Sequence, residues 1–283
     1  MSKRKVTQTL KPLKKLKSNS ESIRIATWNV CGLRALLKRN ALVQLLEEED
    51  PHILCLNETK LQEKHVEQIK AQLPSTYYSY WNCSTAKKGY SGVAILSKTK
   101  PLNVTYGIGI SKHDLEGRAV IAEYNRFYVV STYVPNAGDG LWRLGYRTQE
   151  WDLDLRTYLD KLQKTKPVIW AGDLNVIHED IDIHNIKGKE KCACCTPEER
   201  GNFSETLETN KFLDTFRMLN PGVKGWSYYP RRNVKAKEKG QGWRLDYIVV
   251  SQALKRSVMK AYIRDDIDGS DHHPCLLDLS FRK

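Results

Sequence analysis

The sequence predicts an α/β fold of the α+β type, a four-layered sandwich in which two mixed β-sheets are flanked by helices. Two observations lead to this prediction. Segments with helical spacing and strand-like apolar runs mix along the chain, without the regular alternation of βαβ units. No linker divides residues 23–283, so we expect one domain there. Residues 1–22 are rich in Lys, Ser and Thr, and we expect them to form a disordered basic tail.

The elements of the first half follow from hydrophobic spacing and from residues that end helices. Leucine and valine recur at helical spacing until Asp50-Pro51, and Pro74 ends a second helix. Between Tyr77 and Val134, turn residues separate short apolar runs, which is typical of strands. The expected helices are 35–49 and 63–73, and the expected strands are 23–30, 52–59, 90–96, 102–106, 118–123 and 127–134.

The second half begins with a long amphipathic helix at about residues 147–162, followed by a strand from Val168. Thr196-Pro197 is a good N-cap and first-turn pair, so another helix is expected to begin there. A further element is expected at residues 212–219. The end of the chain again has mostly strand-like runs, notably 242–250 and 275–279.

The charge favours a polyanionic partner, because the net charge is +13 and the pI is about 9.3. Seven Lys or Arg and no acid lie in residues 1–20, whereas the rest of the chain holds 39 basic and 33 acidic residues. We interpret this tail as a nuclear import signal, with a mitochondrial presequence as the second interpretation. No apolar stretch is long enough to span a membrane, and the first residues lack a signal-peptide core, so neither a membrane partner nor secretion is expected.

The cysteine pattern indicates a reducing compartment, because seven cysteines occur without a signal peptide. Cys192, Cys194 and Cys195 are close in sequence, but no second Cys pair or His pair follows at zinc-finger spacing. Structural zinc is therefore not expected, and we interpret this stretch as a surface loop with oxidisable thiols.

Three short polar clusters each adjoin an apolar run. Asp173 and Asn175 end the run that starts at Pro167, Asp246 opens another run, and Asp271-His272 precedes a third. Carboxylates, amides and imidazoles at the ends of buried strands are costly unless they satisfy one another or take part in chemistry. These clusters therefore predict a single polar pocket where strand ends meet.

Similar groups follow other predicted strands: Asn29, then Glu58, then Tyr133 with Asn136. Carboxylates such as Glu58 and Asp271 are the hard oxygen ligands that Mg²⁺ requires. His272 with Asp246 suits an oriented, charge-stabilised imidazole, and Asp173 with Asn175 suits the positioning of a water. Each cluster alone is more often structural, as a surface Glu, an internal Asp–His bond or an Asn turn. Together, and on a basic chain, they favour metal-assisted phosphodiester hydrolysis.

The same motifs resemble those of the exonuclease III-like class II apurinic/apyrimidinic (AP) endonucleases, within the endonuclease/exonuclease/phosphatase superfamily. The similarity runs from about residue 23 to the end. The broader motifs are Gly172-Asp-Leu-Asn175 and Gly269-Ser-Asp-His272, and the narrower ones are Tyr133-Val-Pro-Asn-Ala-Gly138 and Gly242-Trp-Arg-Leu-Asp-Tyr247. Trp28-Asn-Val30, Gly32-Leu-Arg34, Leu56-Asn-Glu-Thr-Lys60, Gly89-Tyr-Ser-Gly-Val93 and Thr196-Pro-Glu-Glu-Arg200 occur in the same order.

The resemblance implies a DNA-repair hydrolase that acts in base excision repair. It would cut duplex DNA 5′ to an abasic site and leave a 3′-hydroxyl, with 3′-phosphodiesterase and 3′→5′ exonuclease activity alongside. Glu58 would be the main ligand of Mg²⁺, or of Mn²⁺ in its place, with Asn29 and Asp271 nearby. The partner would be duplex DNA containing abasic sites, and the protein is expected to be a monomer.

The resemblance also implies roles for the catalytic groups. Asp173 would activate or orient the attacking water, and Asn175 would hold the site and the phosphate. His272, supported by Asp246, would contact the scissile phosphate and stabilise its developing charge. Tyr133 and Asn136 would form a phosphate-side pair.

Substrate selection is expected to use an aromatic pocket, because an abasic sugar leaves the base stack readily. Tyr228 and Trp243 are the candidates for its walls, with core packing as the alternative for Trp243. The residues expected to contact DNA phosphates are Arg34, Lys38, Tyr90, Arg118 and Arg147.

The chain departs from the family pattern in four places. Cys31 stands where the family usually has Asp, which removes a carboxylate from the metal neighbourhood. Asp139 replaces an expected basic residue in a loop that would press on DNA. Residues 187–195 lack the family's asparagine-rich loop, and the basic segment 229–233 is expected to compensate through phosphate contacts.

These departures keep two other functions open. One is an abasic-DNA-binding or regulatory protein whose catalysis is weakened by Cys31. The other is a phosphoinositide or sphingomyelin phosphodiesterase of the same fold, against which the basic charge and the motif at residues 242–247 argue.

Overall fold

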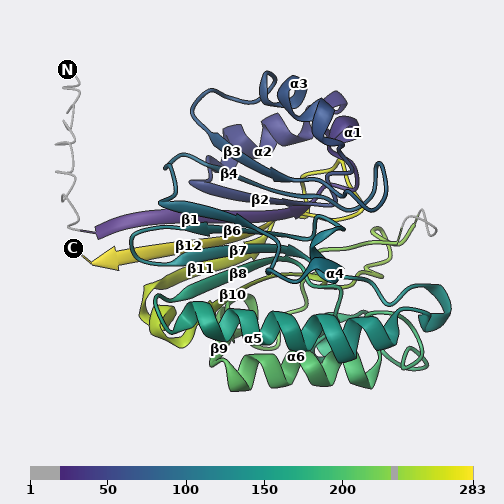
Figure 1. The fold of residues 1–283 in the computed structure, drawn as a ribbon. Coiled ribbons are helices and arrows are strands. Elements are labelled where there is room, and N and C mark those ends of the chain that lie inside the picture. Colours follow the sequence, from purple (N-terminus) through teal and green to yellow (C-terminus); the bar gives the residue numbers. More distant parts are fainter. Residues whose placement is uncertain (1–19, 231–234, 283) are drawn as a thin grey trace, which may run out of the picture.

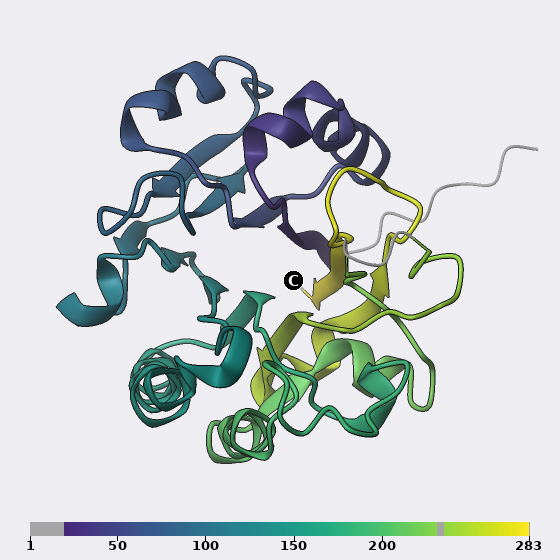
Figure 2. The ribbon, with the colours of Figure 1, turned by 90° about the vertical axis from the view of Figure 1, so that its right-hand side faces the viewer.

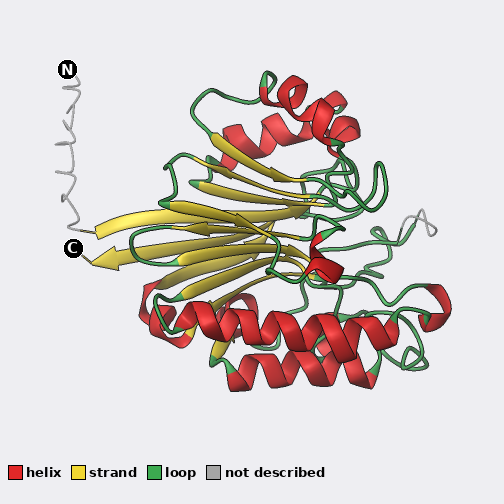
Figure 3. Ribbon diagram, viewed as in Figure 1, coloured by secondary structure: helices red, strands yellow, loops and turns green. Residues whose placement is uncertain are grey.

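Two six-stranded mixed sheets pack face to face, and helices cover their outer faces, which confirms the predicted fold class (Figures 1 and 3). The structure is a computed structural model and describes residues 20–230 and 235–282. One sheet has the order β11 (Val258–Ile263), β12 (Cys275–Arg282), β1 (Ser20–Asn29), β2 (Ile53–Asn57), β4 (Val93–Ser97), β3 (Tyr78–Asn82). The other has the order β5 (Asn103–Tyr106), β6 (Ala119–Glu123), β7 (Tyr128–Tyr133), β8 (Val168–Asp173), β10 (Asp246–Ser251), β9 (Phe212–Asp214).

The helices form the two outer layers because each buries an apolar face on the neighbouring sheet. The first sheet is covered by α1 (Leu33–Lys38), α2 (Ala41–Glu49) and α3 (Val66–Lys70), and the second by α5 (Asp152–Gln163) and α6 (Pro197–Thr209) (Figure 1). The shorter helical segments are η1 (Glu63–His65), α4 (Ser111–Asp114), η2 (Asp139–Leu141), η3 (Tyr146–Trp151), η4 (Asp180–Asp182), α7 (Thr215–Leu219) and η5 (Gln252–Ser257). In the described ranges, no helix combines the length and apolar character needed to cross a membrane.

Several predicted boundaries were wrong. The helix expected at 35–49 is two helices, because Asn40 adopts a left-handed conformation (φ 59°) between α1 and α2. The helix expected at 63–73 is η1 followed by the short α3, and the helix expected from 147 opens with the π-helical turn η3. The first strand begins at Ser20, three residues inside the predicted tail, and the rest of that tail lies outside the described residues.

The N-terminus of α6 was predicted correctly. Thr196 caps it, and its hydroxyl accepts a bond from the Glu199 backbone while the Glu199 carboxylate accepts from the Thr196 backbone. This reciprocal capping box satisfies donors that the first helical turn leaves unpaired.

The strand ends that carry the polar clusters meet at one end of the sandwich. In the parallel pairs, Asn29 lies opposite Asn57, and Tyr133 lies opposite Asp173. Asp246 opens the antiparallel β10 directly opposite Asp173. Figure 2 looks onto this end and shows the connecting loops of both sheets arranged around it.

Gly172 allows β7 and β8 to approach closely just before Asp173. A Cβ atom at this position would lie 1.9 Å from the Thr132 carbonyl oxygen, and the φ of 150° is one that other residues rarely adopt. The glycine of the Gly-Asp-Leu-Asn motif is therefore needed to set Asp173 at the correct height in the sheet.

Candidate active site

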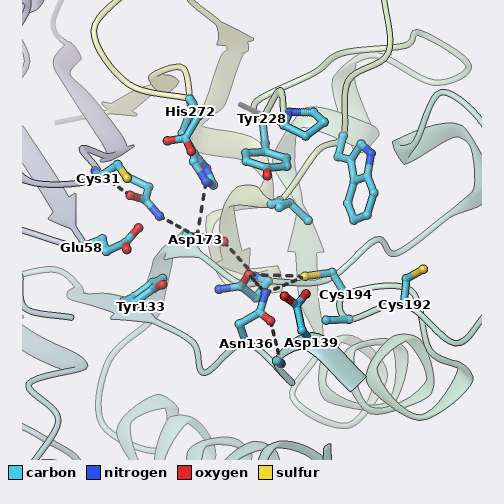
Figure 4. A pocket seen from close by; sticks show the side chains of 18 of the residues that line it. Cys31, Glu58, Tyr133, Asn136, Asp139, Asp173, Cys192, Cys194, Tyr228 and His272 are labelled. Atoms are coloured by element: carbon cyan, nitrogen blue, oxygen red, sulfur yellow. Dashed lines mark hydrogen bonds and ion pairs between the residues drawn. The ribbon is translucent and has the colours of Figure 1, made fainter. Parts of the chain in front are cut away.

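The predicted polar groups surround one pocket of about 630 Å³ at the end of the sandwich (Figure 4). Ten of the predicted site residues line it: Asn29, Glu58, Tyr133, Asn136, Asp173, Asn175, Tyr228, Trp243, Asp271 and His272. Asp246 lies behind His272 and contacts the pocket through it. The prediction that strand ends converge on a single polar pocket is confirmed.

Asp173 is held at the floor of the pocket, between His272 and Asn136 in Figure 4. Its side chain is 2% exposed; one carboxylate oxygen accepts from the Asn29 amide (2.8 Å) and the other from the Asn175 backbone N–H (3.0 Å). Burial raises the pKa of Asp173 to about 7, because few waters remain to stabilise the charge. Such a carboxylate can exchange a proton near neutral pH.

His272 is fixed by a buried carboxylate. Its Nδ1 lies 2.7 Å from the Asp246 Oδ2, and its Nε2 lies 3.9 Å from the Asp173 Oδ2. Its backbone carbonyl accepts a bond from the Trp28 indole N–H (2.9 Å). Burial opposes a charge on the ring, but the carboxylates of Asp246 and Asp173 outweigh it and raise the pKa of His272 to about 10. The ring is therefore an imidazolium at neutral pH, suited to a phosphate oxygen.

Asn136 and Asn175 form a second polar pair beside Asp173. The Asn136 amide donates to the Asn175 Oδ1 (2.8 Å), and the Asn175 amide donates to the Val134 carbonyl (2.9 Å). Asn175 has a left-handed backbone (φ 47°), a strained conformation that often occurs at functional sites. The two amides are thereby oriented without need of a ligand.

Cys194 touches this amide pair and was missed as a site residue. Its Sγ lies 3.4 Å from the Asn175 Oδ1 and 3.3 Å from the Asn136 Nδ2. The expected surface loop of oxidisable thiols was wrong for two cysteines, because Cys194 and Cys195 are only 2% and 1% exposed. Burial raises the pKa of both thiols, which makes them poor nucleophiles. Nothing in the sequence spacing distinguishes a buried thiol from an exposed one here.

Glu58 faces the pocket from the first sheet, with Lys60 beside it. The Lys60 Nζ lies 2.9 Å from the Glu58 carboxylate and 3.5 Å from the Cys31 Sγ. Cys31 therefore occupies the place next to Glu58 where the family pattern has a second carboxylate. The backbone of Cys31 has a positive φ (44°), and Asp also tolerates this left-handed conformation. Lys60 partly neutralises the charge of Glu58 on this side of the pocket, a role that the sequence motifs did not predict.

Two sets of side chains could hold a metal ion. Asp173, Asp246 and His272 bring ligand atoms within 4.8 Å of one another. In that set, however, the imidazole is already hydrogen bonded and charged, which opposes a cation. Glu58, Asp271 and the side-chain carbonyl of Asn29 offer only oxygen atoms as metal ligands, and oxygen is the ligand type that Mg²⁺ prefers. The residues present therefore fit a hard divalent ion on the Glu58 side.

Tyr228 and Trp243 stand together on the opposite wall. Their rings are 6.1 Å apart in an edge-on arrangement, and Tyr228 also packs on His272 at 4.7 Å. Trp243 is partly buried: one side of it lines the pocket, and it also packs on the apolar cluster that includes Ile183 and Leu245, so both the pocket-wall role and the core-packing alternative agree with its position.

Arg147 was predicted to contact DNA phosphates, but it is 3% exposed. Its guanidinium pairs with Asp152 (2.8 Å) and donates to the carbonyls of Pro135 (2.9 Å) and Leu174 (3.0 Å). A guanidinium whose donors are used inside the protein cannot grip an external phosphate. The phosphate contact is therefore wrong, and Arg147 instead ties together the two loops that carry the amide pair.

Arg118 is likewise buried, at 2% exposed. It donates to Glu116 (2.6 Å), to the Tyr133 carbonyl (3.0 Å) and to the Tyr90 hydroxyl (2.7 Å). Its predicted phosphate contact is wrong for the same reason, and Tyr90 is partly engaged through the same cluster. Arg34 and Lys38 are exposed on α1, so a phosphate contact remains a prediction for them.

Comparison with known proteins agrees with this geometry. The chain matches the Endonuclease/Exonuclease/phosphatase family over residues 26–272. A Danio rerio protein named DNA repair nuclease APEX1 is 48% identical over 92% of this chain and 83% of that protein. A Dictyostelium discoideum DNA-(apurinic or apyrimidinic site) endonuclease is 44% identical over 91% and 71%. The crystal structure of an AP endonuclease from Leishmania major superposes with a TM-score of 0.85 at 32% identity, over 92% and 88% of the two chains. The chain therefore belongs to the endonuclease/exonuclease/phosphatase family, in the branch of the AP endonuclease-like DNA-repair nucleases that its motifs predicted.

Proposed function

We propose that this protein is a Mg²⁺-dependent nuclease of base excision repair that cuts duplex DNA 5′ to an abasic site and leaves a 3′-hydroxyl. The observation that carries the proposal is the meeting of Asp173, His272 with Asp246, and the Asn136–Asn175 pair in one pocket. The names of the Danio and Dictyostelium relatives support the repair role. A Bacillus subtilis relative named exodeoxyribonuclease, 42% identical over 89% of this chain, supports an accompanying exonuclease activity, and we propose that it runs 3′→5′ together with 3′-phosphodiesterase activity.

The reaction follows from what each group can do with its proton. With a pKa of about 7, Asp173 can take a proton from an attacking water at neutral pH. His272, charged and oriented by Asp246, would face the phosphate oxygen on which negative charge develops. The Asn175 and Asn136 amides would hold the phosphate. Burial raises the pKa of Tyr133 well above its ordinary range, so its hydroxyl would keep its proton as a hydrogen-bond donor.

The family is one of metal-dependent nucleases. Glu58 would be the principal protein ligand of Mg²⁺, with Asp271 and the Asn29 carbonyl beside it, and Mn²⁺ would serve in its place. When bound, the ion would supply charge neutralisation at the phosphate. Lys60 already pairs with Glu58, so it would balance the charge of that carboxylate between turnovers.

Substrate choice would rest on the wall formed by Tyr228 and Trp243, which leaves room for a bare deoxyribose. Exposed Arg34 and Lys38, with Tyr90, would contact phosphates of duplex DNA. We propose that the protein works as a monomer. On the strength of its basic tail, we also propose that it is located in the nucleus, with the mitochondrion as the second location. Arg231, Arg232 and Asn233, expected to add phosphate contacts, lie outside the described residues.

One incision assay tests this function. A labelled duplex with a single abasic site should be cut once, on its 5′ side, in Mg²⁺, and chelation with EDTA should stop the cut. Glu58→Gln removes the main carboxylate ligand, so the Mg²⁺ concentration for half-maximal rate should rise by about tenfold or more, in the range that loss of a coordination partner produces. Equal rates with and without EDTA would contradict the metal requirement. Cleavage of a phosphoinositide in place of abasic DNA would contradict the substrate.

Cys31 is the observation that favours the second function, an abasic-DNA-binding protein with weakened catalysis. We expect Cys31→Asp to lower the Mg²⁺ requirement a few-fold, because it adds a carboxylate beside Glu58, and to leave the rate at saturating Mg²⁺ within about threefold. Cys31→Ser, which adds no charge, is the matched control. A rise of about 10²-fold or more in the saturated rate of Cys31→Asp would instead support the binding protein.

A further inference from the structure

Trp142 presents a large apolar surface to solvent at the edge of the pocket. It is 76% exposed, more than any other large apolar side chain among the described residues. Isolated exposed apolar residues are ordinary, but a fully presented indole beside a reactive pocket is a common feature of ligand-binding surfaces. The Trp142 indole has no role in the metal binding or the hydrolysis proposed for this pocket.

The indole is held in place by the backbone beneath it. A Cβ atom on Gly138 would lie 2.3 Å from the Trp142 Nε1, so the ring rests directly on this glycine. The turn is closed by bonds from Leu141 N–H to the Gly138 carbonyl (2.9 Å) and from Arg143 N–H to the Ala137 carbonyl (2.9 Å). The Arg143 guanidinium lies 5.5 Å from the ring centre. A ring held in this way loses little rotamer freedom when a ligand stacks on it.

The turn that carries Trp142 borders the pocket of the proposed reaction centre. Gly138, Asp139 and Gly140 line the pocket, and Asn136 of the amide pair lies just before them in the chain. The Asn136 Oδ1 accepts a bond from the Gly138 N–H (2.8 Å), so the turn and the amide pair move as one unit. Figure 4 shows the Asp139 side chain beside Asn136.

The charges around the ring argue for an uncharged ligand. Asp139 brings a carboxylate to this turn where the family pattern has a basic residue, so the turn attracts a phosphate less than that pattern would. Arg143, the cation that lies over the ring, is already paired with Glu116 (3.0 Å) and bonded to the Tyr90 hydroxyl (3.0 Å). Every nucleobase has a flat neutral face, so any of the bases can stack on an indole. An abasic site supplies such faces, because the bases around the gap have lost a stacking neighbour.

We propose that Trp142 is a nucleobase-stacking residue, whose indole takes a base left unstacked beside the abasic position and so helps to select damaged DNA. The inference rests on the proposed function, since it requires an abasic duplex in the pocket. Asp139 stands where a basic residue was expected in a loop that would press on DNA, and stacking by Trp142 would give this turn another way to contact DNA. The chain replaces a salt-dependent phosphate contact at this turn with a stacking contact that releases no counterions.

The test uses full-length protein and a duplex with a tetrahydrofuran abasic site, carrying 2-aminopurine next to the site in one version and opposite it in another. Binding is measured without Mg²⁺, and incision with it. Wild type should quench 2-aminopurine in at least one version. Trp142→Ala should lose that quenching and bind roughly tenfold more weakly, with the loss appearing in KM more than in kcat. Trp142→Phe should retain most of both, because it keeps an aromatic face.

Two controls separate the outcomes. Leu102, 61% exposed at the far end of the sheet, is the matched apolar residue, and Leu102→Ala should behave as wild type. The factor by which Trp142→Ala weakens binding of the abasic duplex should also be the same at 50 and 200 mM KCl. If Trp142→Ala quenches and binds as wild type does, or if Trp142→Phe loses as much as Trp142→Ala, stacking is overturned. If wild type itself neither binds nor cuts the abasic duplex, the proposed function fails instead.

Discussion

Replacement of Asp173 by Asn is expected to lower the rate of incision by roughly 10²–10⁴-fold, the range for loss of a positioned acid–base group. The amide has the shape of the carboxylate and can keep the bond from the Asn175 backbone, but it cannot take a proton from water. Binding of abasic DNA should change far less than the rate. Single-turnover incision on a labelled abasic duplex, with a separate binding titration, measures both.

The same substitution should not destabilise the protein at neutral or higher pH, because removal of the buried charge outweighs the loss of the bond from the Asn29 amide, which the new amide nitrogen cannot accept. Burial raises the pKa of Asp173 to about 7, so folding takes up a proton between about pH 4 and pH 7. The ionised carboxylate therefore costs stability above pH 7, and that cost fades as pH falls toward 4. The melting temperature of Asp173→Asn should equal or exceed that of wild type at pH 8, and the difference should shrink as the pH is lowered.

Asp278→Asn is a suitable control, because Asp278 pairs with Arg24 midway along the β1–β12 pairing, and neither residue lines the pocket. It should incise at the wild-type rate. If Asp173→Asn also cuts at that rate, Asp173 is not the base. If it melts well below wild type at pH 8, the loss of activity cannot be assigned to chemistry.

The convergence of the site was predictable from the sequence because polar groups at the ends of apolar runs need partners. Asp173 and Asp246 are far apart in the chain, yet each ends or opens a strand in the same sheet and they lie directly opposite each other. Their side chains are buried, and a buried carboxylate without partners is costly. The pattern therefore indicated a shared pocket, while the motif resemblance supplied the roles of its residues, which periodicity alone could not.

The errors concern features that depend on distant partners. Arg147 is an ordinary basic residue in the sequence, and its internal role depends on carbonyls of Pro135 and Leu174 that only the fold brings near. Helical spacing continued through Asn40, where a left-handed residue breaks the helix without a proline or glycine to signal it. The burial of Cys194 depends on how its loop folds back over the amide pair. Local patterns carry no information about such contacts.

Loss of the His272–Asp246 pair is the other change expected to have a large effect. His272→Ala should lower incision by about 10²–10⁴-fold, because the imidazolium beside the phosphate is removed. Asp246→Asn should lower it by on the order of 10²–10³-fold, as for loss of one charge-stabilising partner. The amide oxygen introduced by Asp246→Asn could still accept a bond from the His272 Nδ1, but it would no longer stabilise the charge of the ring.

Titration of the ring distinguishes this electrostatic role from a structural one. The carboxylates of Asp246 and Asp173 raise the pKa of His272 to about 10 against the effect of burial, so the charged form persists to high pH and is lost as pH rises through that value. In Asp246→Asn the pKa should fall toward about 6.5, the ordinary histidine value, and the alkaline loss of activity should move to lower pH with it. Imidazole NMR on the metal-free protein measures the first effect, and a pH–rate profile the second.

A second His–Asp pair in this chain, of which only the histidine is buried, provides the control. His113 is fully buried and bonded to Asp154 (2.9 Å), outside the pocket, so Asp154→Asn should leave incision unchanged. If Asp246 acts only through His272, the double variant Asp246→Asn with His272→Ala should be no slower than His272→Ala alone, because groups that act as one unit lose their effect together. Additive losses would mean that Asp246 has a separate role, for instance through the Asp173 carboxylate opposite it, and that the imidazolium is not the means by which it acts.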